Sequence, residues 1–148
     1  MFKFMLALFV CLGASVFAQE LPDAKGKEVV MKTCTVCHGL EPILQAGRDA
    51  EEWVDVSEFM ETNGARIDPD ERDGIIAYLS KYMGPLVNVN AASAEVLAKQ
   101  LELRAKQAAA LVEFRANNGN FKEFADLAKV PGLDAKKLAL FRYRLRFK

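Results

Sequence analysis

Two cysteines and the single histidine of this sequence lie within five consecutive residues. They read Cys34-Thr-Val-Cys37-His38, a C-x-x-C-H motif, in a chain that holds 3 cysteines and 1 histidine. Thiols and an imidazole at this spacing can bind a metal, form a redox-active pair, or attach haem covalently. A zinc site would need a fourth ligand, and a thioredoxin-like pair would need a surrounding βαβ pattern, which is missing. The motif therefore favours covalent attachment of one haem c, with a simple disulfide across a tight turn as the alternative.

The spacing has a mechanical reason. Two thiols three residues apart on a helical turn can reach the two vinyl groups along one edge of the porphyrin as thioethers. The next residue, His38, is then placed beneath the ring, where its imidazole can ligate the iron. We therefore expect Cys34 and Cys37 as covalent haem attachments and His38 as an axial iron ligand.

The N-terminus has the layout of a secretory signal peptide over residues 1–18. Lys3 precedes an apolar run that is followed by small residues ending at Ala18, where cleavage is expected. A membrane anchor is disfavoured because it needs ~20 apolar residues. We expect a periplasmic or otherwise exported protein, soluble after cleavage and without a membrane span in the mature chain. Export agrees with haem attachment, which bacteria carry out outside the cytoplasm.

The charge of the chain is divided between its halves. The 148 residues contain 20 basic and 20 acidic side chains, but residues 19–85 carry 7 basic and 14 acidic ones, and residues 86–148 carry 12 and 6. The division of charge predicts two small units with different surfaces. The length of the chain excludes a large multidomain enzyme. With His38 bound to iron, no second histidine remains as a base and no paired carboxylates stand out. An electron carrier is therefore expected, not an enzyme.

Three helices are predicted around the motif. One runs from Gly26 into the two cysteines, a short amphipathic one covers residues 52–60, and one covers residues 68–83. Asp68 is the expected N-cap of the third helix, with Pro69 at its first position and Glu71 three residues on. Its apolar residues at helical spacing should pack over the haem and the first helix; they are Ile75, Ile76, Leu79 and Tyr82.

Residues 24–84 resemble a small class I c-type cytochrome. The resemblance implies a methionine opposite His38, and Met60 is the candidate. It belongs to a W…M…G…YL pattern of short periplasmic cytochrome domains, matched here by Trp53, Met60, Gly64, Tyr78 and Leu79. Met31 is expected on the same side of the ring as His38, and Met83 at the end of the last helix. If Met60 is instead an ordinary core residue, a five-coordinate haem able to sense a small ligand is the alternative.

A second helical unit is predicted after Pro85, which ends the preceding helix. Ser93 is a plausible N-cap for a helix from Ala94, and a longer helix follows over residues 103–117. Asn118-Gly119 is a turn signal, and two more helices are expected over residues 121–128 and 135–147. The predicted fold class is thus all-α, with a cytochrome c-like domain over residues 19–85 and a second domain over residues 86–148.

The second unit contains the segments Val87-Asn-Val-Asn-Ala-Ala-Ser-Ala-Glu95, Leu111-Val-Glu-Phe-Arg115, Asn118-Gly119, Phe121, Leu127 and Val130-Pro-Gly-Leu133. On these residues it resembles, over residues 86–147, the tandem helix-hairpin-helix module of the competence DNA-receptor family. In that family each hairpin carries Gly-x-Gly, whose backbone amides approach a DNA phosphate. Here the first hairpin, near Leu101-Glu102-Leu103-Arg104, has no glycine, and Glu102 would repel a phosphate. The second keeps Gly132 but has Asp134 at the second glycine position. The residues expected to make weak contacts with nucleic acid or with a protein partner are Gly132, Lys136, Lys137, Arg142, Arg144 and Arg146.

Together these patterns predict a periplasmic mono-haem c-type cytochrome that transfers single electrons between redox protein partners. The helix-hairpin-helix unit would serve as a docking module. The alternatives are an exported helix-hairpin-helix DNA-binding protein and a five-coordinate haem sensor.

Overall fold

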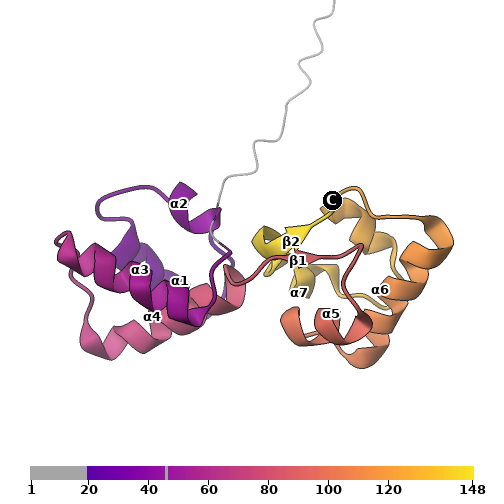
Figure 1. Cartoon of the computed structure of the whole chain (residues 1–148), viewed down its shortest axis with the longest axis horizontal. Coiled ribbons are helices and arrows are strands. Elements are labelled where there is room, and N and C mark those ends of the chain that lie inside the picture. Colours follow the sequence, from indigo (N-terminus) through magenta and orange to yellow (C-terminus); the bar gives the residue numbers. More distant parts are fainter. Residues whose placement is uncertain (1–19, 46) are drawn as a thin grey trace, which may run out of the picture.

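The helices gather into two groups that follow the order of the sequence (Figure 1). The computed structural model describes residues 20–45 and 47–148, so the predicted signal peptide lies outside the described residues. The N-terminal part, residues 20–83, contains α1 (Lys27–Cys34), α2 (Glu41–Leu44), α3 (Ala50–Thr62) and α4 (Pro69–Tyr82).

The C-terminal part, residues 84–148, is also mainly helical. A pair of two-residue parallel strands joins its two ends, with Val87 opposite Leu145 and Asn88 opposite Arg146. The all-α prediction is confirmed. The elements of this part are β1 (Val87–Asn88), α5 (Ala94–Gln100), α6 (Ala105–Asn118), the 3-10 helix η1 (Phe124–Lys129), α7 (Ala135–Ala139), the 3-10 helix η2 (Arg142–Arg144) and β2 (Leu145–Arg146).

Side-chain caps determine where several helices begin. The Asp49 carboxylate accepts the Glu52 amide at 3.0 Å, and the Glu52 carboxylate accepts the Asp49 amide at 2.9 Å, which is a reciprocal capping box at the start of α3. The Ser93 hydroxyl accepts the Val96 amide at 3.3 Å, so its predicted capping role is confirmed. These caps satisfy amides that have no partner within the helix.

The N-cap of α4 is confirmed, but its partner is not the one expected. The Asp68 carboxylate accepts the amide of Asp70 at 3.0 Å. Glu71 does not complete a capping box; its carboxylate instead pairs with the ammonium of Lys32 on α1 at 2.9 Å. Glu71 therefore links α4 to the helix that leads into the cysteines.

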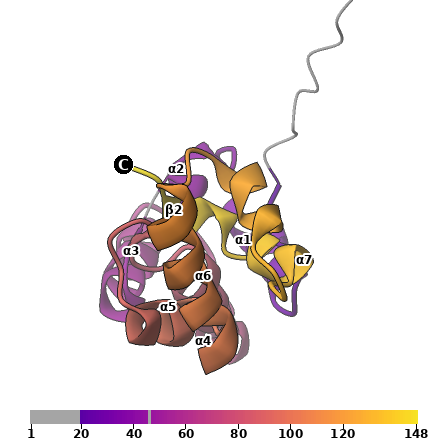
Figure 2. The ribbon, with the colours of Figure 1, turned by 90° about the vertical axis from the view of Figure 1, so that its right-hand side faces the viewer.

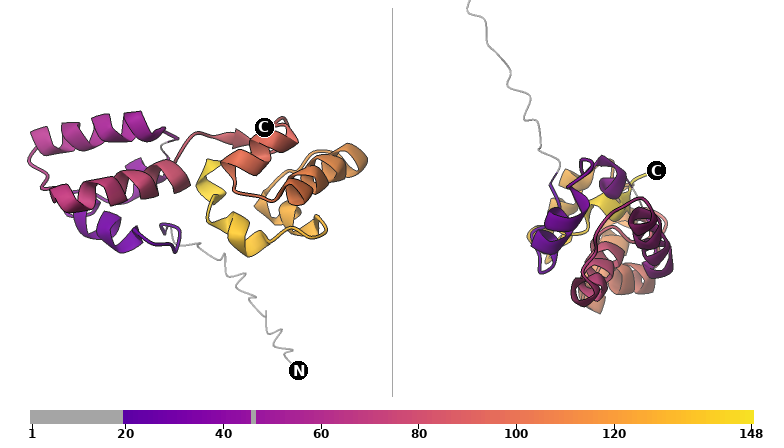
Figure 3. Two further views of the ribbon diagram at one scale, coloured as in Figure 1. Left: turned by 90° about the horizontal axis from the view of Figure 1, so that it is seen from below. Right: turned by 90° about the vertical axis from the view of Figure 1, so that its left-hand side faces the viewer.

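Helix α4 is the centre of the N-terminal part. It packs against α3 on one side and α1 on another, as the view from below shows (Figure 3). Ile75, Leu79 and Tyr82 are buried as predicted, and Ile76 is half-buried. The helix α2 was not predicted from the sequence; it buries Ile43 and Leu44 in a single turn.

In the C-terminal part α5 and α6 lie side by side (Figure 2). The prediction of one final helix over residues 135–147 is wrong, because α7 ends at Ala139 and the chain becomes extended again at Leu145. The physical reason is tertiary: Leu145 is buried opposite Val87, and the carbonyl of Arg146 accepts the amide of Val89 at 3.0 Å. Across residues 20–45 and 47–148, no helix combines the length and apolar character required to cross a bilayer.

Candidate functional site

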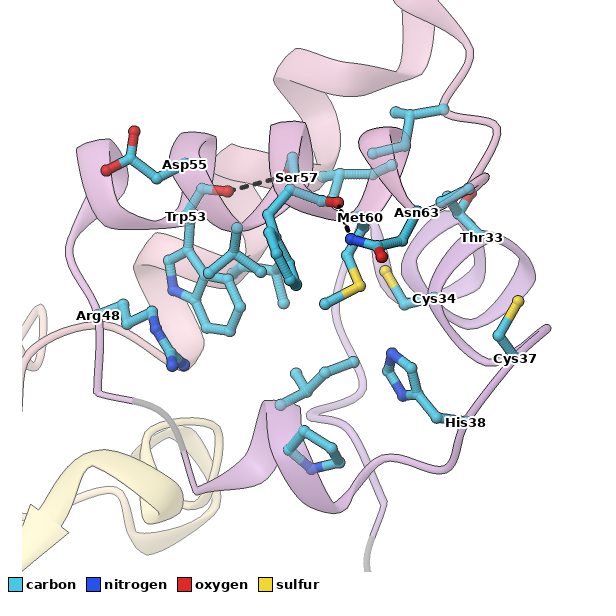
Figure 4. Close-up of a pocket in the computed structure, with 18 residues that line it drawn as sticks. Thr33, Cys34, Cys37, His38, Arg48, Trp53, Asp55, Ser57, Met60 and Asn63 are labelled. Carbon is cyan, nitrogen blue, oxygen red and sulfur yellow. Dashed lines mark hydrogen bonds between the residues drawn. The ribbon is translucent and has the colours of Figure 1, made fainter.

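A cavity of about 540 Å³ opens between α1, α3 and α4, and the C-x-x-C-H motif forms one of its walls. Its volume lies within the ~300–1,000 Å³ that small-molecule and cofactor sites occupy. Most of the side chains around it are apolar. They include Pro42, Ile43, Trp53, Val56, Phe59, Met60, Ile67, Ile75 and Leu79 (Figure 4).

The two motif cysteines line this cavity from the end of α1 and the turn that follows. Cys34 is the last residue of α1 and is half-buried, whereas Cys37 is exposed. Both are free thiols, so the disulfide weighed as an alternative is not formed. Burial raises the pKa of the Cys34 thiol, which therefore stays protonated at neutral pH.

The imidazole of His38 is oriented by its own loop. Its Nδ1 lies 2.7 Å from the carbonyl oxygen of Gly39. A carbonyl can only accept, so Nδ1 carries the proton and donates it, and Nε2 keeps its lone pair. A histidine held in this tautomer presents Nε2 as a metal ligand.

Met60 reaches the cavity from α3, on a different element from His38 (Figure 4). The other methionines of the N-terminal part are not among the lining residues: Met83 is buried at 2% exposure, and Met31 is 36% exposed on α1. The fold thus brings together a thioether and an imidazole that are 22 positions apart in the sequence.

One buried polar atom, in a side chain that lines this cavity, has no hydrogen-bond partner in the described part of the chain. It is the indole Nε1 of Trp53, whose side chain is 2% exposed. Arg48 also lines the cavity, with its guanidinium carbon 5.5 Å from the centre of the Trp53 ring. Buried donors are nearly always satisfied in native proteins, so this pair suits an acidic group on a ligand. Arg48 was not identified from the sequence, since no motif marks an arginine just before a helix cap.

The residues present fit a haem. A largely apolar cavity suits the porphyrin, the paired thiols suit its vinyl edge, and the orphaned Trp53 donor with Arg48 suits its carboxylates. Within the described part of the chain, no group of three or more His, Cys, Asp or Glu side chains is placed to hold a metal ion. Cys34, Cys37 and His38 are therefore not gathered around a common point as in a structural zinc site.

The C-terminal residues named from the sequence are dispersed. Gly132 has φ +75° at an exposed turn, with no heavy atom within 4 Å of the position a Cβ would take. Lys136 is exposed at the start of α7. The Lys137 ammonium donates to the carbonyl of Glu102 at 2.7 Å, which links the two hairpins. Arg142 is exposed and lies over the ring of Tyr143.

The expectation for Arg144 is corrected. Its side chain is 4% exposed and its guanidinium donates to oxygens of its own chain, so it does not present its charge to an outside phosphate. Arg146 is half-buried and donates to the carbonyls of Tyr143 and Leu145. The basic composition of the C-terminal segment thus overstates its exposed positive charge.

Comparison with protein families identifies a helix-hairpin-helix motif over residues 84–146. Comparison with curated proteins and with solved structures gives no match. The C-terminal part therefore carries a helix-hairpin-helix motif, and it is called the helix-hairpin-helix unit below. Glu102 at the tip of the first hairpin has φ +50°, the backbone conformation that glycine ordinarily provides.

Proposed function

We propose that the N-terminal part holds one covalent haem c and carries single electrons between redox proteins outside the cytoplasm. The observation that carries the proposal is one apolar cavity, lined by Cys34, Cys37 and His38 from the end of α1 and the turn after it, and by Met60 from α3. The signal-like sequence from Met1 to Ala18 supports the location. Haem iron supplies one-electron redox chemistry when bound.

Each motif residue has one role in this proposal. The Cys34 and Cys37 thiols would hold the haem covalently, each as a thioether to one of its two vinyl groups. His38 would hold the iron through Nε2, because its Nδ1 proton is donated to the carbonyl of Gly39. Met60 offers its thioether from α3, and a methionine ligand raises the reduction potential.

The acidic surface of the N-terminal part indicates the kind of redox partner. Residues 19–85 carry 14 acidic and 7 basic side chains. Such a surface favours association with a basic partner, and the rate of that association should fall as salt rises.

The test is an absorption spectrum of protein exported from a host that attaches c-type haem. We expect a low-spin spectrum after reduction by dithionite and a weak red-region band of methionine–ferric iron ligation in the oxidised form. The Met60→Ala variant should lose that band. Met31→Ala is the matched control, because Met31 lies in the same part of the chain but outside the cavity lining, and it should keep the band.

Two outcomes would contradict this proposal. If the exported protein carries no covalent haem, the proposal is wrong. A high-spin spectrum, together with carbon monoxide binding that is the same in the native protein and in the Met60→Ala variant, would favour a five-coordinate haem sensor over an electron carrier.

A second candidate function, nucleic-acid binding by the C-terminal part, is favoured by the helix-hairpin-helix match at residues 84–146. Its second hairpin keeps an exposed glycine, Gly132, with exposed Lys136 close by. Phosphate contacts need positive charge and accessible amides. The first hairpin offers Glu102 at its tip instead, so any binding should be weak and should depend on the second hairpin.

Fluorescence anisotropy with duplex DNA separates these two functions of the chain. If the C-terminal part binds DNA, the affinity should fall steeply with salt and fall further in a Lys136→Gln, Arg142→Gln variant. Lys25→Gln, an exposed substitution in the N-terminal part, is the control for loss of charge alone. An absence of binding at low salt would exclude this candidate.

A further inference from the structure

Arg144 is buried where the N-terminal and C-terminal parts meet. Its Nε donates to the carbonyl of Pro85 at 3.0 Å, and its Nη1 donates to the carbonyls of Lys81 at 2.7 Å and Gln100 at 3.0 Å. Its Nη2 donates to the Gln100 side-chain oxygen at 2.5 Å. All these acceptors are neutral, so this arginine is held by backbone and amide oxygens and not by an ion pair.

Two of these acceptors are the ends of helices. Lys81 lies in the last turn of α4, and Gln100 is the last residue of α5. Carbonyls in the last turn of a helix lack partners within the helix and carry partial negative charge. One guanidinium therefore caps a helix of the N-terminal part and a helix of the helix-hairpin-helix unit at the same time.

The tip of the first hairpin contacts the same helix end. The Glu102 carboxylate lies 2.7 Å from the ammonium of Lys81, next to the carbonyl that Arg144 caps. A carboxylate at a hairpin tip repels a phosphate but attracts a lysine. The side chain that disfavours nucleic acid at this hairpin is thus the one that contacts α4.

Apolar and backbone contacts extend the junction. The rings of Tyr82 and Phe141 have centroids 5.6 Å apart. The N-terminal segment also contributes, because the Tyr143 hydroxyl donates to the carbonyl of Glu20 at 2.8 Å. Next to Glu20, Leu21 is buried at 2% exposure. The two parts therefore meet through a buried cation, a ring contact and a segment of chain at the start of the described residues.

We propose that the helix-hairpin-helix unit takes the N-terminal part of its own chain as its partner, through its first hairpin and Arg144. In this arrangement the first hairpin is an internal docking surface for the C-terminal end of α4, and the two parts move as one body. The second hairpin, with exposed Gly132 and Lys136, then faces solvent at a fixed position relative to the cavity between α1, α3 and α4. The proposal does not depend on whether that cavity holds haem.

Backbone ¹⁵N relaxation of the full mature chain tests this proposal. Two parts joined by a flexible link would tumble with separate rotational correlation times, whereas one body has a single correlation time. We expect one correlation time for residues of α3 and α6 in the native chain. Separate times in the native chain would overturn the proposal.

Arg144→Gln should release the junction while each part stays folded. We expect two correlation times and, with a protease that cuts near Gly84-Pro85-Leu86, cleavage at least about tenfold faster, because cleavage follows the population of the open form. Gln100→Ala, which keeps Arg144 and removes one acceptor, should give an intermediate rate and remains informative if Arg144→Gln does not fold. Arg66→Gln, the same change at an exposed arginine, is the matched control and should behave as the native chain. A folded Arg144→Gln variant with a single correlation time and unchanged cleavage would contradict the role of Arg144.

Discussion

The guanidinium carbon of Arg48 lies 5.5 Å from the centre of the Trp53 ring, beside an indole nitrogen that has no hydrogen-bond partner in the described part of the chain. Arg48 precedes the capping residue Asp49, and Trp53 lies in the first turns of α3. The capping box at the start of α3 thus lies between these two cavity-lining residues in the chain. A positive charge and a buried N–H donor side by side are suited to a carboxylate of the ligand.

The first prediction concerns Trp53→Phe. This change removes the orphaned donor and some ring volume in both the haem-free and the haem-loaded protein, but it removes a hydrogen bond only from the loaded one. The loaded form should therefore lose about 1–3 kcal/mol more of its free energy of unfolding than the haem-free form. Denaturant titrations of the two forms, with and without the substitution, measure this difference.

Comparing the two forms cancels the cost of the lost volume, which alone could mask the effect. Equal losses in the two forms would show that the Trp53 donor meets no acceptor on the ligand.

The second prediction concerns Tyr78, whose hydroxyl donates to the carbonyl of Pro22 at 2.5 Å in a buried position. Tyr78→Phe leaves that carbonyl without its donor and should cost about 1–2 kcal/mol in urea unfolding. Tyr143→Phe is the control, because the hydrogen bond of Tyr143 to Glu20 is exposed and water can replace it. A loss no larger at Tyr78 than at Tyr143 would contradict this account.

The buried position of Tyr78 also affects its titration. Burial, the largest cause, raises the pKa of its hydroxyl well above the ordinary value of 10.0. The donor is therefore retained throughout the neutral and moderately alkaline range. An ultraviolet titration of the folded protein should show one tyrosine that ionises only at strongly alkaline pH.

The third prediction is a pH dependence at Asp126. Its hydrogen bond with the Lys129 side chain, followed by those from the amides of Lys122 and Glu123, lowers its pKa from 3.8 to about 2. A carboxyl whose pKa is lowered by folding stabilises the protein above its unfolded value, and this contribution is lost as pH falls through the folded value. Asp126→Asn should therefore be less stable than the native chain at pH 7, with the difference vanishing between about pH 4 and pH 2.

Thermal unfolding midpoints of both proteins across that pH range test this prediction. A difference that stays constant down to pH 2 would mean that the effect comes from the cap geometry of η1 and not from the charge.

The fourth prediction contrasts two glycines that both have open space where a Cβ would lie. Gly74 lies within α4, where alanine fits and reduces the entropy of the unfolded chain, so Gly74→Ala should stabilise by ~0.4–1 kcal/mol. Gly132 has φ +75°, so Gly132→Ala should destabilise by ~1–2 kcal/mol. Urea unfolding of both variants measures the two signs. If both substitutions change the free energy of unfolding in the same direction, the backbone at Gly132 can relax to accept alanine.

Some features of the fold could be predicted because they depend on near neighbours in the chain. The caps at Asp68 and Ser93, the helix leading to Cys34 and the turn at Gly119 involve residues within about four positions of each other. The capping box of Asp49 with Glu52 has the same local origin, although it was not identified. The error in the final helix has the opposite origin, because Leu145 pairs with Val87, which is 58 positions away.

The sequence by itself determined the chemistry available to this protein: two thiols and an imidazole within five residues, a candidate thioether at Met60, and a division of charge between the two parts. Only the tertiary structure decided which groups meet. It brought Met60 and Trp53 to the cavity wall, added Arg48, and buried Arg144, which composition had placed among the exposed cations. The reason is physical. Local hydrogen bonds and helical spacing depend on residues that are close in the sequence. Burial depends on which apolar faces pack together, and these faces come from segments far apart in the chain.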